Sequence, residues 1–355
     1  MLVALSAQSP ARQPRSVEAV AQNAWDALNA GRAGEAERLF DEALKAAPGH
    51  PALLVGAAAA AHLAGRPDVA RIHLVNALDR DPRFTPASLM LGQVLYGAGD
   101  IAGAMATYEN ALRYAPGHPQ LAKNLERWRQ EASLHERFDQ RVAVHFTVLF
   151  EGPAEAPLAA RAVEILEKAY WKIGAALYAY PPDVITVVLY TREQFRDVTQ
   201  SPAWAGGAFD GRIRVPVQGA LQNLAEFERV LTHELVHAFV RSIAGTSVPQ
   251  WLDEGLAIYF EGSDRSQRIA QLKSAPERLP LARLEESFGG LNDGRARIAY
   301  AESGVAVVRL FEEAGTTGVA NLLGDLAARV PFGAAFERHV GMTYEAFQQL
   351  LVSPL

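Results

Sequence analysis

The chain has 355 residues, 49% of them hydrophobic and 21% charged, which is an ordinary globular composition and long enough for two domains. Its 34 Lys and Arg against 40 Asp and Glu give a formal charge of −6, which argues against binding nucleic acid. The chain contains no cysteine, so disulfides and thiolate nucleophiles are excluded and any metal must be held by His, Asp or Glu. No stretch is long and apolar enough to predict a transmembrane segment.

The first fifteen residues form a short terminal segment. Residues 1–7 are apolar and precede a polar run that contains proline, a pattern shared by the end of a signal peptide and by a disordered stub. Both interpretations stay open for residues 1–15. The apolar start favours a periplasmic or exported protein over a cytoplasmic one.

A repeat of 34 residues occupies the first third of the chain, because Gly31, Gly65 and Gly99 are each 34 residues apart. Within each block the glycine separates two helical patterns, and a proline ends the second. Other positions in the same register are Ala36, Ala70, Ala104, Phe40, Leu74, Tyr108, Pro48, Pro82 and Pro116. The spacing predicts three helical hairpins and, over 119–138, an amphipathic capping helix, so one domain is expected over 16–138.

This pattern resembles the tetratricopeptide repeat (TPR). The resemblance implies a helical array with a curved surface that binds a protein partner or a peptide. The alternative is that the array only packs on the domain that follows it.

A second domain is expected over 140–355, because the hydrophobic pattern changes from helical to β near residue 140. Strands are predicted over 142–150 and 184–190, a strand or a hairpin over 208–217, helices over 157–179 and 192–198, and mostly helices beyond 221. Pro216 lacks a ladder donor and suits an edge position. Strands that precede helices indicate an α+β domain, so the whole chain is predicted as a helical array followed by an α+β domain.

The segment 232–238 carries the chemistry of this domain. His233 and His237 are four residues apart in a helix predicted over 221–243, so both imidazoles can face one metal ion. Glu234 lies beside them, where it can reach a water molecule that attacks a substrate. Two paired surface histidines are the alternative interpretation.

A third ligand is expected 17 residues after His237. The loop 244–248 would fold a second helix back on the first, bringing the carboxylate of Glu254 to the metal. Asp253 competes for this role, or is a charge that complements the helix dipole. Gly255 removes bulk beside Glu254 and is expected to let the two helices approach closely.

At these residues the chain resembles the gluzincin metallopeptidases, and specifically the bacterial peptidase MA-like domain, in which HExxH is followed by W-L-x-E-G-L-A, here 251–257. The resemblance covers most of 140–350 and implies a thermolysin-like zincin domain with a small β-sheet and a mainly helical C-terminal part. It implies one Zn2+ per chain, held by His233, His237 and Glu254, with Glu234 as the general base. By analogy, Tyr300 would stabilise the substrate's carbonyl oxygen, unless it is only a buried aromatic. Ser303 is a weaker option.

Three further features bear on substrate recognition. The strand over 209–215 could pair with substrate backbone. Arg212 and Arg214 would point to one side of it, either as solvated surface residues or toward an acidic substrate. Glu261 lies on the same helical face as Glu254, where it would be either an acceptor for a ligand imidazole or a surface charge.

Two functions from different classes remain. The first is a zinc-dependent endopeptidase whose array recruits peptide or protein substrates or a partner protein. The second is a non-hydrolytic scaffold with a vestigial or structural metal site. A decayed site usually loses its base or a ligand, whereas His233, Glu234, His237 and Glu254 are all present, so we favour the first.

Overall fold

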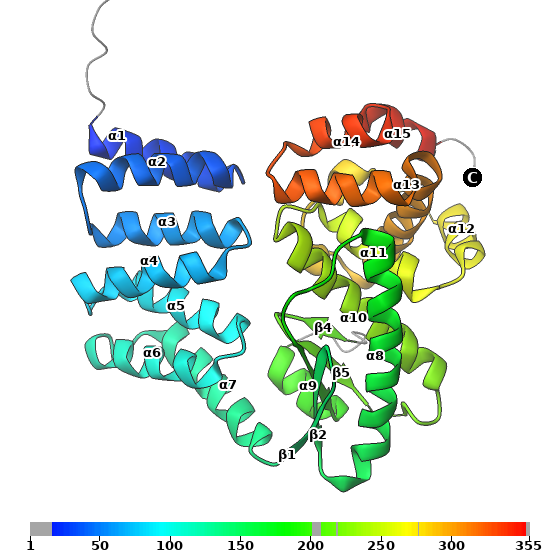
Figure 1. Cartoon of the computed structure of the whole chain (residues 1–355), viewed down its shortest axis with the longest axis horizontal. Helices are drawn as coiled ribbons and strands as arrows, with labels where there is room; N and C mark the ends of the chain where they lie inside the picture. The colour runs from blue at the N-terminus through cyan, green and yellow to red at the C-terminus, as the bar shows by residue number, and fades with distance from the viewer. Residues whose placement is uncertain (1–15, 201–206, 218, 276, 353–355) are drawn as a thin grey trace, which may run out of the picture.

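The computed structural model describes residues 16–200, 207–217, 219–275 and 277–352. Figure 1 shows a stack of helices on one side of the molecule and, beside it, a mixed part that contains a small sheet and the remaining helices. Residues 1–15, for which a signal peptide and a disordered stub were both considered, lie outside the described residues. No helix in the described part is both long and apolar enough to cross a membrane.

The first part is an array of paired helices, as the 34-residue repeat predicts. The helices are α1 (Val17–Asn29), α2 (Ala33–Ala46), α3 (Pro51–Leu63), α4 (Pro67–Arg80), α5 (Thr85–Gly97), α6 (Ile101–Tyr114) and α7 (Pro119–His135). Alanines fill much of the interior between them, which allows the helices to lie close together. The capping helix α7 covers the last hairpin with Trp128, whose ring lies 4.5 Å from that of Tyr108 and stacks at 5.0 Å on Tyr96.

The second part contains one sheet of five strands. They are β1 (Phe138–Val142), β2 (Phe146–Glu151), β3 (Ile185–Tyr190), β4 (Ala208–Phe209) and β5 (Ile213–Pro216), in the order β1-β2-β3-β5-β4. The central pairs are parallel, and the outer pairs β1·β2 and β4·β5 are antiparallel. The prediction of a single strand over 142–150 is wrong in detail. Val142 ends the edge strand β1, and residues 143–145 connect β1 to β2, so Val142 and Val144 are exposed.

Helices cover both faces of the sheet and build the rest of this part. They are α8 (Ala156–Leu177), α9 (Arg192–Thr199), α10 (Leu224–Ala244), α11 (Gln250–Glu261), α12 (Arg265–Ser274), α13 (Asp293–Ala327), α14 (Phe332–Val340) and α15 (Tyr344–Val352), with 3-10 turns at Pro153–Glu155, Leu281–Arg283 and Phe288–Gly290. One face packs on α8 and α10 in the largest hydrophobic core. The other packs on α9 and the end of α7. The predicted α+β character of this part is confirmed.

The array docks on the second part through each of its three hairpins, by helix α2 in the first and by the turns before α4 and α6 in the other two. At the first, Glu37 Oε2 lies 3.2 Å from Arg329 Nη1. At the second, Gly65 meets Gly245 so closely that a Cβ on Gly65 would lie 2.9 Å from the Gly245 Cα. At the third, Arg212 Nη2 donates to Gly99 O at 2.5 Å. The array therefore packs on the neighbouring domain at regular intervals.

Candidate metal centre

Helix α10 carries the first two site residues. It begins after Asn223, whose side chain accepts from the backbone N–H of Glu226, and it ends at Gly245, which has a positive φ of 63°. The loop after Gly245 reverses the chain into α11, which packs on α10. The reversal brings Glu254 to the two histidines.

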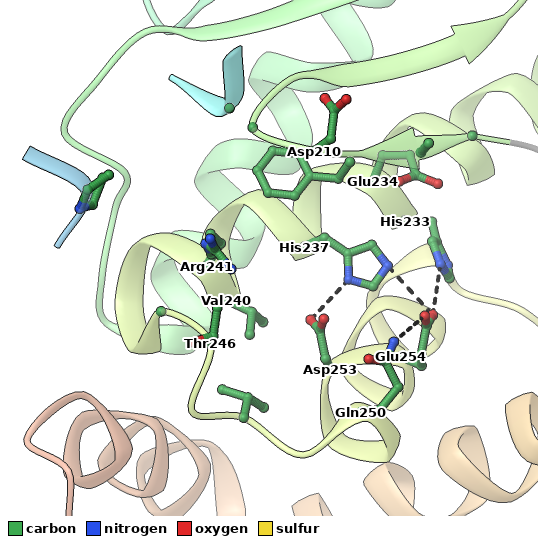
Figure 2. A pocket seen from close by; sticks show the side chains of 18 of the residues that line it. Asp210, His233, Glu234, His237, Val240, Arg241, Thr246, Gln250, Asp253 and Glu254 are labelled. Atoms are coloured by element: carbon green, nitrogen blue, oxygen red, sulfur yellow. Dashed lines mark hydrogen bonds and ion pairs between the residues drawn. The ribbon is translucent and has the colours of Figure 1, made fainter. Parts of the chain in front are cut away.

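Three side-chain atoms converge between these helices. Glu254 Oε2 lies 3.4 Å from His233 Nε2 and 3.6 Å from His237 Nε2 (Figure 2). Candidate ligand atoms of the three residues all lie within 4.8 Å of one another. Gln250 donates to the other carboxylate oxygen of Glu254 at 2.9 Å, which fixes the direction of the carboxylate.

Two more carboxylates hold the far nitrogens of the imidazoles. Glu261 Oε2 lies 2.8 Å from His233 Nδ1, and Asp253 Oδ1 lies 3.0 Å from His237 Nδ1. An imidazole that donates from Nδ1 presents Nε2 as its lone pair, as metal-binding histidines do. The structure thus places Glu261 as the acceptor considered above, and it gives Asp253 an orienting position while Glu254 joins the cluster.

The carboxylates set the charge of the centre. Burial alone would lower the pKa of both imidazoles, but Asp253 and Glu254 raise that of His237 to about 9. Contacts with Glu254 and Glu261 raise the pKa of His233 to about 10. Burial would raise the pKa of Glu254, yet the imidazoles hold it below its usual range, His237 most strongly. The surroundings therefore favour positive charge at the point where the three atoms meet.

The three residues fit a zinc ion. Tetrahedral ligands at 2.0–2.1 Å from zinc are about 3.3 Å apart, close to the separations from Glu254 Oε2 to the two Nε2 atoms. Glu254 Oε2 is buried and has no hydrogen-bond partner within the described ranges, so a cation would satisfy it. Two imidazoles and one carboxylate are also a common donor set of catalytic zinc.

Glu234 and Tyr300 line the cleft around this cluster. Burial raises the pKa of Glu234 above its usual range. Its carboxylate is closely covered by Gly207, where a Cβ would lie 2.6 Å from Glu234 Oε1. Tyr300, in the second turn of α13, also has a raised pKa because of burial and the nearby charges of Glu254 and Glu234. Ser303 does not suit the role considered for it, because its buried hydroxyl donates to Ala299 O at 2.8 Å.

Gly255 permits a close approach, but with a different helix from the one predicted. A Cβ on Gly255 would clash with Ser303 O and Val307 Cγ2, which belong to α13. The expectation that Gly255 brings α10 and α11 together is therefore wrong. A small residue in a sequence indicates a contact without identifying the element on its other side.

The cleft is built by both parts of the molecule. It has a volume of about 660 Å3. Helices α10 and α11 and strand β4 contribute to its lining, while His62, Gln93 and Gly97 come from helices α3 and α5 of the array. The repeats alone gave no indication of this, because it depends on how the array docks.

A buried ionic cluster, also missed from the sequence, supports the β4–β5 turn at this cleft. Glu131 of α7 accepts from Arg214 Nη1 at 2.7 Å and from the Tyr96 hydroxyl at 2.5 Å, and Arg212 Nη1 lies 3.5 Å away. Arg214 is 1% exposed and also binds Asp210 at 3.1 Å. Neither interpretation of Arg212 and Arg214 holds, since both are buried against the array.

The predicted edge strand also needs correction. Strand β5 lies between β3 and β4, so β4, and not β5, forms this edge of the described sheet, with β1 at the other edge. Pro216 is tolerated in β5 because the two-residue β4 pairs only with Ile213 and Arg214.

Comparisons with known proteins agree with this architecture. The sequence profile of the Peptidase MA superfamily matches residues 162–351, and a tetratricopeptide repeat profile matches residues 61–127. Tetratricopeptide domains bind protein partners. No curated protein matches the chain.

Two solved structures resemble the array. The first tetratricopeptide domain of Spaghetti (RPAP3), bound to an HSP90 peptide, is 19% identical, with a TM-score of 0.32 over 33% of this chain and 93% of that one. The Sgt2 tetratricopeptide domain from Aspergillus fumigatus is 23% identical, with a TM-score of 0.33 over 37% and 92%. The peptidase profile spans more than half of the 355 residues, so the chain belongs to the Peptidase MA superfamily and carries tetratricopeptide repeats before its peptidase domain.

Proposed function

We propose that this protein is a zinc-dependent endopeptidase. The observation that carries the proposal is the convergence of Glu254 Oε2 with the Nε2 atoms of His233 and His237, while Asp253 and Glu261 occupy the opposite imidazole nitrogens. Such a site holds a metal through three protein atoms and leaves a position open for catalysis. Superfamily membership supports a metal-dependent peptidase.

The chemistry divides among the residues of the cleft. Zinc bound by the three ligands would act as a Lewis acid on the scissile carbonyl and make water a stronger nucleophile. Glu234 would take the proton from the attacking water on its carboxylate and pass it to the leaving nitrogen. Its burial, which raises its pKa, suits a base that must hold this proton between the two steps. The Tyr300 hydroxyl would donate to the carbonyl oxygen as negative charge develops there.

Substrate binding is proposed to involve β4 and the array. Ala208 and Phe209 form the last described strand of the sheet and line the cleft, so an extended peptide could add to this edge. Another part of the cleft wall comes from α3 and α5. We therefore assign the array a role in recruiting and orienting a peptide or protein substrate, in keeping with the partner binding of tetratricopeptide domains.

Metal analysis tests the ligand set. Purified wild type should hold about one zinc per chain, and His237→Ala and Glu254→Ala should each lose most of it, because each removes a ligand. His73→Ala, which changes a histidine of α4 outside the cleft, is the matched control and should keep its zinc. Asp253→Ala should retain more zinc than Glu254→Ala, and the opposite order would show that the ligand assignment is wrong.

Hydrolysis tests the general base. Glu234→Gln should bind zinc as wild type does but digest unfolded casein about 10²- to 10⁴-fold more slowly, because the proton acceptor is lost. Undiminished digestion would remove Glu234 from the mechanism. A wild-type protein that binds zinc and digests no casein or peptide library would instead favour the non-hydrolytic scaffold.

A further inference from the structure

One cation faces the cleft without a carboxylate counter-ion among the residues that the structure describes. Arg241 follows His233 and His237 on α10 at the same four-residue step, so the three share a helical face. Figure 2 shows it at the wall of the pocket, beside His237. Among the described lining residues it is the only lysine or arginine.

The nearby carboxylates are engaged elsewhere. Asp253 lies close enough to influence Arg241 electrostatically, but its carboxylate is bound to His237. Asp210, also in the cleft wall, pairs with Arg214. Across the described ranges, no carboxylate lies within ion-pair distance of Arg241. Its guanidinium therefore offers a fork of donors to whatever enters the cleft.

The array places a second polar group beside this arginine. His62, near the end of α3, lines the same cleft, and its Nδ1 is buried with no hydrogen-bond partner in the part of the chain described. Burial and the adjacent charge of Arg241 lower the pKa of His62, so it is neutral near pH 7 and available as a hydrogen-bonding group. The peptidase domain and the array thus contribute one group each.

We propose that Arg241 and His62 form a subsite for a carboxylate of the peptide substrate, either an acidic side chain or the C-terminal carboxylate. The proposal rests on the endopeptidase function above. Arginine binds carboxylates through two parallel hydrogen bonds, and an acidic group here would otherwise meet only the negative charges of Glu234, Asp253 and Glu254. Four residues of helix advance about 6 Å, so the carboxylate would lie roughly two residues from the scissile bond.

Peptide binding to an inactive chain tests the subsite. Three pools of random heptapeptides carry a neutral fluorophore and differ only in their acidic group: an internal Glu with a C-terminal amide, a free C-terminus without Glu, or neither. Fluorescence anisotropy then gives their affinity for the full-length, zinc-loaded Glu234→Gln protein. At least one acidic pool should bind about tenfold or more tightly than the neutral pool, and the better one identifies the source of the carboxylate.

The variants separate the subsite from general electrostatics. Adding Arg241→Gln should abolish the preference, Arg241→Lys should restore part of it, and His62→Phe should weaken it. Arg161→Gln removes an exposed arginine of α8 outside the cleft and should leave it intact. Equal binding of all pools, a preference that survives Arg241→Gln, or no binding up to about 1 mM would each overturn the proposal. If the preference appears but the wild type cleaves none of the pools, the subsite stands and the peptidase function fails.

Discussion

Substituting Glu131 by Gln should destabilise the protein strongly, although the residue lies far in sequence from the HExxH motif. Glu131 is fully buried in α7 and pairs with the buried guanidinium of Arg214. Gln keeps the size of the side chain but removes its charge. It also replaces one of the two acceptor oxygens by an amide N–H group, which then faces other donors. Arg214 would still donate to the hydroxyls of Tyr96 and Tyr190, but its one remaining carboxylate partner among the described residues would be Asp210, whose side chain is 40% exposed.

The expected loss in free energy of unfolding is about 3 kcal/mol. Removing one partner of a buried ion pair costs about 3–5 kcal/mol, and the remaining contact with Asp210 places this case at the lower end. The pKa of Glu131 supports the sign: burial would raise it, but Arg214 and Tyr96 hold it below its usual range. The charged form is thus the one that the fold stabilises, and its contribution is lost as pH falls through that lowered pKa.

Urea denaturation followed by circular dichroism measures this loss. The control is Glu109→Gln. Glu109 of α6 has an exposed carboxylate that lies 2.8 Å from Arg129 of α7, the helix that also carries Glu131. An exposed pair contributes about 0–1 kcal/mol, so the control should unfold almost as wild type does. If both variants lose less than 1 kcal/mol, the cluster does not hold the array to the peptidase domain as we describe.

Two further outcomes are expected. Burial lowers the pKa of His135 to about 4, so the folded protein keeps it neutral while the unfolded chain binds a proton below about pH 6.5. Wild type should therefore lose about 2 kcal/mol more stability than His135→Gln between pH 7 and 4.5, and equal losses in urea titrations would contradict the assignment. Glu261→Gln and Asp253→Asn should each weaken zinc binding about 10- to 100-fold in competition with a chromogenic chelator, because the acceptors that orient the imidazoles lose their negative charge. Unchanged affinity in both would show that the imidazoles are held by other contacts.

Local sequence periodicity predicted the features that depend on neighbours along the chain. The 34-residue step of Gly31, Gly65 and Gly99 predicted the array, and the four-residue step from His233 to His237 predicted that their imidazoles face one point. Glu254 could be selected because a short loop limits where the next helix can go. In each case the distance in space follows from a few residues of regular backbone.

Features that depend on docking between distant segments could not be predicted in this way. Alternation along a strand places Arg212 and Arg214 on one side, but it does not reveal that α7 covers that side with Glu131, 83 residues before Arg214. The position of His62 in the cleft depends in the same way on how α3 meets α10. A single sequence records which residues are charged or small, and it does not record which surface they will meet.

The regular docking of the three hairpins has a consequence for how this architecture can change. Tetratricopeptide arrays can gain or lose units freely when only their neighbours constrain them. Here Glu37, Gly65 and Gly99 each meet a different part of the peptidase domain, so removing the middle unit would shift the others out of alignment with Arg329 and Arg212. The number of repeats is therefore tied to the size of the Peptidase MA domain beside them, and the length of the array becomes a property of that domain.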